Sequence, residues 1–87
     1  GYNDFMTISL NSENTGFVVD VSIWNSGGKR VRVLGEKSLV GTDTNFIWEG
    51  EGDNQNALPS GIYIVLVEGI HPNGERISFK ETCVLSR

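Results

Sequence analysis

Three carboxylates alternate along one short polar run, and carboxylate oxygens are the ligands that calcium prefers. The run is "WEGEGDNQNALPSGIY", residues 48–63, and its carboxylates are Glu49, Glu51 and Asp53. A helix-flanked calcium loop has Gly at its sixth position and a bidentate Glu at its twelfth. Counted from Glu49, those positions hold Asn54 and Ser60, so this template fails. Two interpretations stay open: a looser calcium site that adds backbone carbonyls, or a polar loop between two strands.

The glycines and the proline of this run favour the loop. Gly50 and Gly52 can supply backbone dihedrals that other residues avoid. Pro59 presets its own φ and pushes Leu58 towards an extended conformation, after which Gly61 lets the chain turn into the next strand. We therefore expect a turn between two strands, and the sequence indicates no cofactor.

Residues that could carry out catalysis are few and isolated. His71 is the single histidine and precedes Pro72 in a predicted hairpin tip, with no nucleophile near it in sequence. "SGGK", residues 26–29, lacks the spacing of a phosphate-binding loop. The lone Cys83 excludes an internal disulfide and a Cys-based zinc cluster, and strand-like alternation around it predicts a small buried thiol. We assign no catalytic residue and predict that the domain is not an enzyme.

Length and charge limit the partners. The 87 residues, numbered 1–87, form a single predicted domain. The formal net charge is −4, which disfavours a surface that follows nucleic-acid phosphates. No apolar run approaches the roughly 20 residues that a membrane span needs.

The chain starts at Gly1 without an initiator Met, so we interpret it as part of a longer protein. We expect the isolated domain to be a monomer.

The apolar pattern has a period of two along most of the chain. Alternation runs through residues 5–10, 17–24, 30–33 and 46–48, as in strands with one face on a core. "IYIVLV", residues 62–67, is apolar throughout and predicts a central strand shielded on both faces. A last strand at 75–85 is interrupted by Glu81, which predicts a bulge or a switch between sheets near Lys80. A short edge strand at 38–40 is a further interpretation.

Turn signals separate these strands, at "NSENTG" (11–16), "NSGG" (25–28) and "HPNGE" (71–75). Six or seven short strands with turns every 8–12 residues predict an all-β sandwich or barrel, and we expect about seven strands.

An ordered set of short motifs over residues 17–87 resembles a known group of domains. The set comprises Gly28-x-x-Val31-Arg32-x-Leu34, Trp48-Glu49-Gly50, Pro59-Ser60-Gly61-x-Tyr63 and a terminal basic residue, Arg87. It is similar to the Ig-like domain of flagellar hook-capping proteins. It is more similar to C-terminal domains of secreted and surface proteins of Bacteroidota-type bacteria, including type IX secretion cargo. The family usually has Asp where this chain has Glu49. The opening "GYND" resembles the tail of an acidic segment that precedes such domains.

The resemblance implies an Ig-like or fibronectin III-like antiparallel β-sandwich. It implies a non-catalytic C-terminal accessory domain of a larger secreted or cell-surface protein, acting in secretion and sorting or as a structural module. Its partner would be transport or attachment machinery, or the preceding domain of the same chain, which meets a sheet edge or the terminal strand at 83–87. The motif residues given structural roles are Gly28, Arg32, Trp48, Glu49, Gly50, Pro59, Gly61, Tyr63 and Arg87.

The alternative function is carbohydrate binding through exposed aromatic rings. We expect Trp48 and Tyr63 in the core, because a thin core needs aromatic filling. Trp24 has the opposite parity to Val21 and Ile23, so it faces away from their side of the strand. With Tyr2, it forms a candidate contact surface.

Overall fold

The computed structural model describes residues 6–11, 16–41 and 43–86, and this part of the chain contains strands and no helix. The strands are β1 (Met6–Asn11), β2 (Phe17–Asn25), β3 (Arg30–Val40), β4 (Asp43–Trp48), β5 (Gly61–Ile70) and β6 (Arg76–Leu85). The sequence predicted an all-β domain of about seven strands, and the described residues form six. The short edge strand expected at 38–40 is the end of β3. No helix in the described ranges could cross a membrane.

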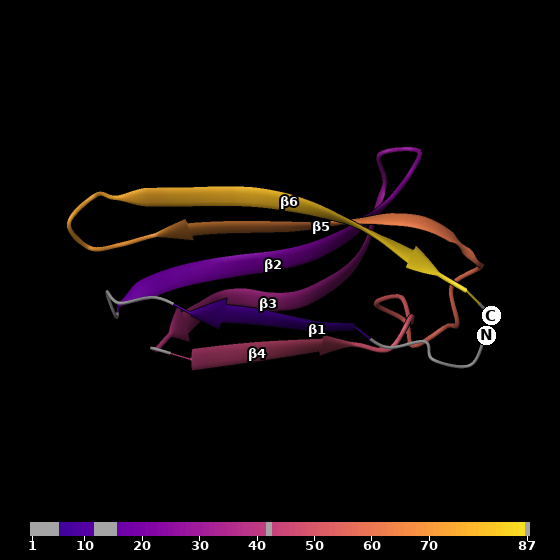
Figure 1. Ribbon diagram of the computed structural model, residues 1–87, viewed down its shortest axis with the longest axis horizontal. Coiled ribbons are helices and arrows are strands. Elements are labelled where there is room, and N and C mark those ends of the chain that lie inside the picture. Colours follow the sequence, from indigo (N-terminus) through magenta and orange to yellow (C-terminus); the bar gives the residue numbers. More distant parts are fainter. Residues whose placement is uncertain (1–5, 12–15, 42, 87) are drawn as a thin grey trace.

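The strands form two antiparallel sheets that pack in a sandwich-like arrangement (Figure 1). The larger sheet has the order β3-β2-β5-β6, and the smaller consists of β1 and β4. β2 and β5 therefore occupy the centre of the larger sheet, as the unbroken apolar run at 62–67 predicted for β5.

The core lies between the sheets and is supplied by alternate residues of the central strands. Val19, Val21 and Ile23 of β2 and Val65 and Val67 of β5 are almost fully buried. Trp48 closes one end of this layer. The complete set of buried apolar residues is Ile8, Leu10, Phe17, Val19, Val21, Ile23, Val40, Trp48, Tyr63, Val65, Val67 and Leu85. Burial of each such side chain contributes about 1.5–3 kcal/mol, which makes these rows the main source of stability.

The turn after β2 shows why its residue types are needed. The Asn25 side-chain oxygen accepts hydrogen bonds from the backbone N–H groups of Gly27 and Lys29, at 3.0 and 2.9 Å. Gly28 adopts a φ of +88°, which side chains with a Cβ rarely tolerate. The N–H of Asn25 donates to the carbonyl of Lys29 at 2.8 Å and closes the hairpin.

β3 is irregular along its length. Its register with β2 shifts between Val19 and Val21 and again further along, and Lys37 has a φ of 48°. The Asp20 carboxylate accepts the backbone N–H of Lys37 at 2.9 Å, which stabilises this bulge. A bulge strengthens the local twist, so β3 curves towards β4 (Figure 1).

β6 is regular, and the predicted bulge or sheet switch near Lys80 is wrong. Its ten residues pair with β5 in unbroken register, which places Glu81 directly opposite buried Val65. We name the alternate residues on this side the inner row of β6; they are Ile77, Phe79, Glu81, Cys83 and Leu85. Glu81 is tolerated there because it is exposed to solvent. The two-stranded sheet is too narrow to cover all of the larger one.

β5 is central, yet its outer face is only partly shielded. Ile62 is 53% exposed, and Ile64 and Leu66 are half-buried. The unbroken apolar run therefore predicted the position of β5 in the sheet correctly. It overestimated the cover on the second face, where the described residues supply no further layer.

Candidate functional site

The polar run at 48–63 is organised by two buried aromatic residues at its ends. Trp48, from the end of β4, donates its indole N–H to the Glu51 carbonyl at 2.9 Å. Tyr63, from β5, donates its hydroxyl to the Pro59 carbonyl at 2.6 Å. The two rings meet edge to face with centroids 5.3 Å apart. Buried Trp and Tyr need partners for their polar groups, and here the loop supplies both.

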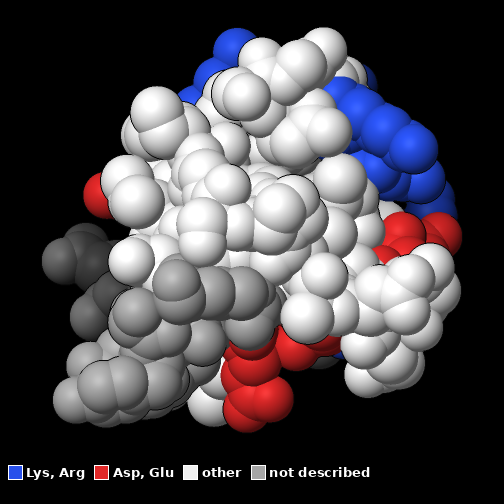
Figure 2. Space-filling model, turned by 90° about the vertical axis from the view of Figure 1, so that its right-hand side faces the viewer, with Lys and Arg blue, Asp and Glu red and all other residues white. Residues whose placement is uncertain are grey.

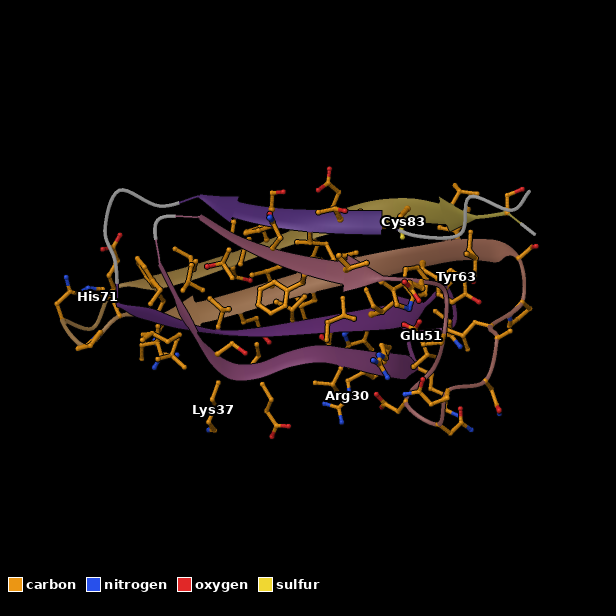
Figure 3. All side chains as sticks on the ribbon, turned by 90° about the horizontal axis from the view of Figure 1, so that it is seen from below. Arg30, Lys37, Glu51, Tyr63, His71 and Cys83 are labelled. Carbon is orange, nitrogen blue, oxygen red and sulfur yellow. The ribbon has the colours of Figure 1, made fainter. Side chains whose placement is uncertain are left out.

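Arg32 joins this cluster from β3. It lies opposite Ile23 and therefore points to the inner side of the larger sheet. Its Nη1 donates to the Gly52 carbonyl at 3.3 Å, and its Nε lies 3.7 Å from Glu51 Oε1. That Nε is buried without a hydrogen bond, so the contact with Glu51 is an ion pair without ideal geometry. Motif residues far apart in the sequence thus meet at one end of the sandwich, where Figure 3 shows Glu51 and Tyr63.

Asp53 attaches the loop to the edge of the larger sheet, a role that sequence reasoning missed. Its backbone N–H donates to the Val31 carbonyl at 3.0 Å, and its carboxylate accepts the Val33 N–H at 2.8 Å. These bonds occupy outward-pointing backbone groups of β3. The loop therefore blocks part of that edge against pairing with another strand.

The glycines of the loop serve different purposes. Gly50 is buried with a φ of +82°, as expected for a position that needs an unusual backbone conformation. Gly52 has no such φ. A Cβ at Gly52 would lie 3.3 Å from the Val31 carbonyl oxygen, so close approach to β3 explains it instead. Gly61 also has an ordinary φ and open space around it, so the predicted need for glycine there is wrong.

The three acidic residues of the run make different contacts. Glu51 lies beside Arg32, and Asp53 accepts the Val33 N–H. Glu49 is exposed, and its backbone N–H donates to Glu51 Oε1 at 3.4 Å. Within the described ranges, no three His, Cys, Asp or Glu side chains come together as a metal site. Calcium binding stays a prediction that only a direct measurement tests.

Trp24 lies on the outer face of the larger sheet, between two hollows. One hollow, of about 290 Å³, is lined by Trp24 with Ile64, Leu66 and Lys80. The other, of about 340 Å³, is more polar and includes Asp20 and Glu68. The indole N–H donates to Ser22 Oγ at 2.9 Å, which holds the half-buried ring along its own strand. The parity argument for Trp24 is confirmed, and its proposed companion Tyr2 lies outside the described residues.

Cys83 and His71 lie far apart (Figure 3). Cys83 is half-buried in the inner row of β6, opposite Tyr63. Burial raises the pKa of its thiol, and the Glu81 carboxylate raises it further, so the neutral thiol is favoured. His71 lies in the hairpin before β6, where its Nδ1 accepts the Asn73 N–H at 3.1 Å and its ring meets Phe17 edge to face. Both contacts give His71 a structural role in the turn.

Two further motif residues are Pro59 and Arg87. Pro59 is exposed and supplies the carbonyl that Tyr63 binds. Arg87 lies outside the described residues. Comparisons of this chain with protein-family models, with curated proteins and with solved structures returned no match.

Proposed function

We propose that this chain is a non-catalytic, Ig-like accessory domain of a larger secreted or cell-surface bacterial protein, and that it acts by presenting a sheet surface to a protein partner. The support is the motif resemblance together with the meeting of Arg32, Trp48, Pro59 and Tyr63 at one end of the sandwich. These residues have architectural contacts, which suits a domain whose motifs specify a fold and its surface. The partner would be secretion or attachment machinery, or a neighbouring domain.

The observation that carries the proposal is a difference between the two edges of the larger sheet. The β3 edge is bulged and is partly covered by the loop bonded to Val31 and Val33. The β6 edge is ten residues long and regular, and in the described part of the chain no strand pairs with its outward side. Natural sheets usually protect such edges, because a regular unpaired edge accepts another strand. Strand addition at the β6 side is therefore the contact we infer.

Apolar side chains near the end of β6 would add contact area. Val84 is 72% exposed and lies opposite exposed Ile62 on the outer face. The end of the molecule shown in Figure 2 has its basic side chains at the margin and a largely uncharged middle. Such a surface suits a partner recognised through backbone hydrogen bonds and apolar side chains.

An export assay tests the sorting role. The 87-residue chain is fused behind a reporter in a Bacteroidota-type bacterium with type IX secretion, and the secreted fraction is compared with that of the reporter alone. Removal of residues 75–87 should abolish export. Because that deletion also removes β6, a double variant, Ile62→Glu with Val84→Glu, changes only exposed side chains and should reduce export while circular dichroism stays unchanged. Normal export of the truncated fusion would discard the sorting role.

Carbohydrate binding is the second candidate, favoured by the hollows beside Trp24. An aromatic ring next to carboxylates and hydroxyls is a common way to bind a sugar ring. The test is a glycan array followed by calorimetry, with Trp24→Ala as the binding-site variant and Ile47→Ala as a matched control at another exposed apolar residue. Binding that survives Trp24→Ala, or no binding to any glycan, would reject this candidate.

A further inference from the structure

The two sheets differ in width, and the difference leaves one side of the core uncovered. In β5 the inward-facing residues Tyr63, Val65 and Val67 are all buried. In β6, the next strand, Phe79 is 41% exposed and Glu81 is also exposed. The change from buried to exposed between neighbouring strands occurs because the smaller sheet ends at β1 on this side.

A cleft marks the same place. It measures about 180 Å³ and lies between β1 and β6, with Leu10, Phe17, Val19, Ile77 and Phe79 among its lining residues. These side chains belong to the inward-facing rows of their strands. The cleft is thus an opening into the apolar layer between the sheets.

The opposite side of the sandwich is closed. Phe46 of β4 packs on Gly35 of β3, so closely that a Cβ at Gly35 would lie 2.6 Å from the ring. The loop at 49–57 covers the beginning of β3 through Asp53 and Arg32. The asymmetry points to the β1 side as the one that a further strand would complete.

The free side of β1 can accept such a strand. β1 pairs with β4 over six residues without a bulge, and within the described residues no strand pairs with its other side. A strand placed there would widen the smaller sheet to three strands and lie across the inner row of β6. Successive side chains of that strand would alternate between this row and solvent.

We propose that β1 binds an extended segment of a partner polypeptide as a third strand, with apolar side chains at alternate positions and one Lys or Arg among them that pairs with Glu81. This inference rests on the proposed function as an interaction domain and places a second contact at β1, separate from the strand addition inferred at the β6 edge. The apolar positions would cover Ile77, Phe79 and Cys83. The basic side chain is needed because a carboxylate that is buried without a partner is strongly destabilising.

The charge pattern also favours a different polypeptide over a second copy of this chain. β1 itself reads "MTISLN" and contains no basic residue. If β1 of a second copy paired with β1, its side chains would bring no positive charge to Glu81. A partner strand with alternate apolar side chains and one basic residue would cover the apolar side chains of the row and pair with the Glu81 carboxylate.

The test uses tethered strands of defined sequence. A ten-residue segment in which valine alternates with threonine, with one central valine changed to lysine, is joined to Gly1 through a flexible Gly/Ser linker. The tether gives an effective concentration of about millimolar, so weak pairing is detectable. A second fusion carries glutamate in place of that lysine. Each is made in the native chain, in Glu81→Lys, and in Glu68→Lys, a control on the opposite face of the sheet.

Amide hydrogen exchange is measured over the whole domain and compared among β1 (residues 6–11), β4 and β6. In the native chain the lysine strand should slow exchange of β1 amides at least tenfold more than the glutamate strand does. In Glu81→Lys the order should reverse, and in Glu68→Lys it should stay as in the native chain. The inference is overturned if no β1 amide is protected, if protection appears only on β4 or β6, or if the order does not reverse. It is also overturned if β1 of the untethered chain becomes protected as protein concentration rises, which would identify a second copy as the occupant. None of these results alters the export assay, so the two proposals can fail separately.

Discussion

Replacement of Tyr63 by Phe removes one hydroxyl from the best-defined contact of the loop. That hydroxyl donates to the Pro59 carbonyl at 2.6 Å, while the ring stays in place against Trp48. A hydrogen bond of this kind contributes about 0.5–1.5 kcal/mol net. Pro59 is exposed, so water can replace the hydroxyl at its carbonyl and the full desolvation cost is avoided. We expect a loss of about 1 kcal/mol in the free energy of unfolding, or about 4–8 °C in Tm for a chain of this size.

Urea and thermal unfolding, followed by circular dichroism and Trp fluorescence, measure this change. Pro59→Ala supplies the matched background because it keeps the backbone carbonyl that accepts the bond. Tyr63→Phe should cost the same free energy in that background as in the native chain, whereas Tyr63→Leu should cost more because it also removes the ring contact with Trp48. If Tyr63→Phe unfolds within about 0.3 kcal/mol of the native chain, which is well below the usual contribution of such a bond, the hydroxyl does not anchor the loop.

Four further substitutions test three other predictions. Gly50→Ala places a Cβ at a buried φ of +82° and should cost about 1 kcal/mol or more in urea unfolding, while Gly61→Ala, at an ordinary φ in open space, should cost little. Asp53→Ala loses the bond to the Val33 N–H and should cost about 1 kcal/mol; it should also increase aggregation measured by light scattering, because the β3 edge is uncovered. Because the folded-state pKa of Cys83 is raised above its ordinary value of 9.0, the stability contributed by the neutral thiol is complete below about pH 9 and is lost above it. Cys83→Ala should flatten that alkaline decline in Tm, and an unchanged decline would contradict it.

Local signals predicted most of the strands and turns. The alternation in 17–24 and the apolar run at 62–67 identified the two central strands, and the residues at 25–28 and 71–75 form the hairpins. These features depend on neighbours a few positions apart, which a single sequence displays directly. Trp24 illustrates the same point, because parity alone placed its ring on the outer face.

The features that the sequence analysis predicted wrongly or missed share a different cause. Glu81 was expected to mark a bulge or a switch between sheets, because it interrupts the apolar row, yet β6 is regular and Glu81 is exposed. Gly52 was attributed to its dihedrals, whereas close approach to the Val31 carbonyl explains it. The bonds of Asp53 to the β3 edge, 20 residues earlier in the chain, were not predicted at all. Each error concerns a contact between segments far apart in the sequence.

The amino-acid order alone determined that this chain forms short strands with one apolar side each, because the side chains of an extended backbone point alternately to opposite faces. Only the tertiary structure decided how wide each sheet is, which edge the loop at 48–63 covers, and which inward row meets solvent. Those properties depend on the pairing of distant segments and on the total apolar area that two sheets can cover together, and neither quantity is written into any local stretch of residues.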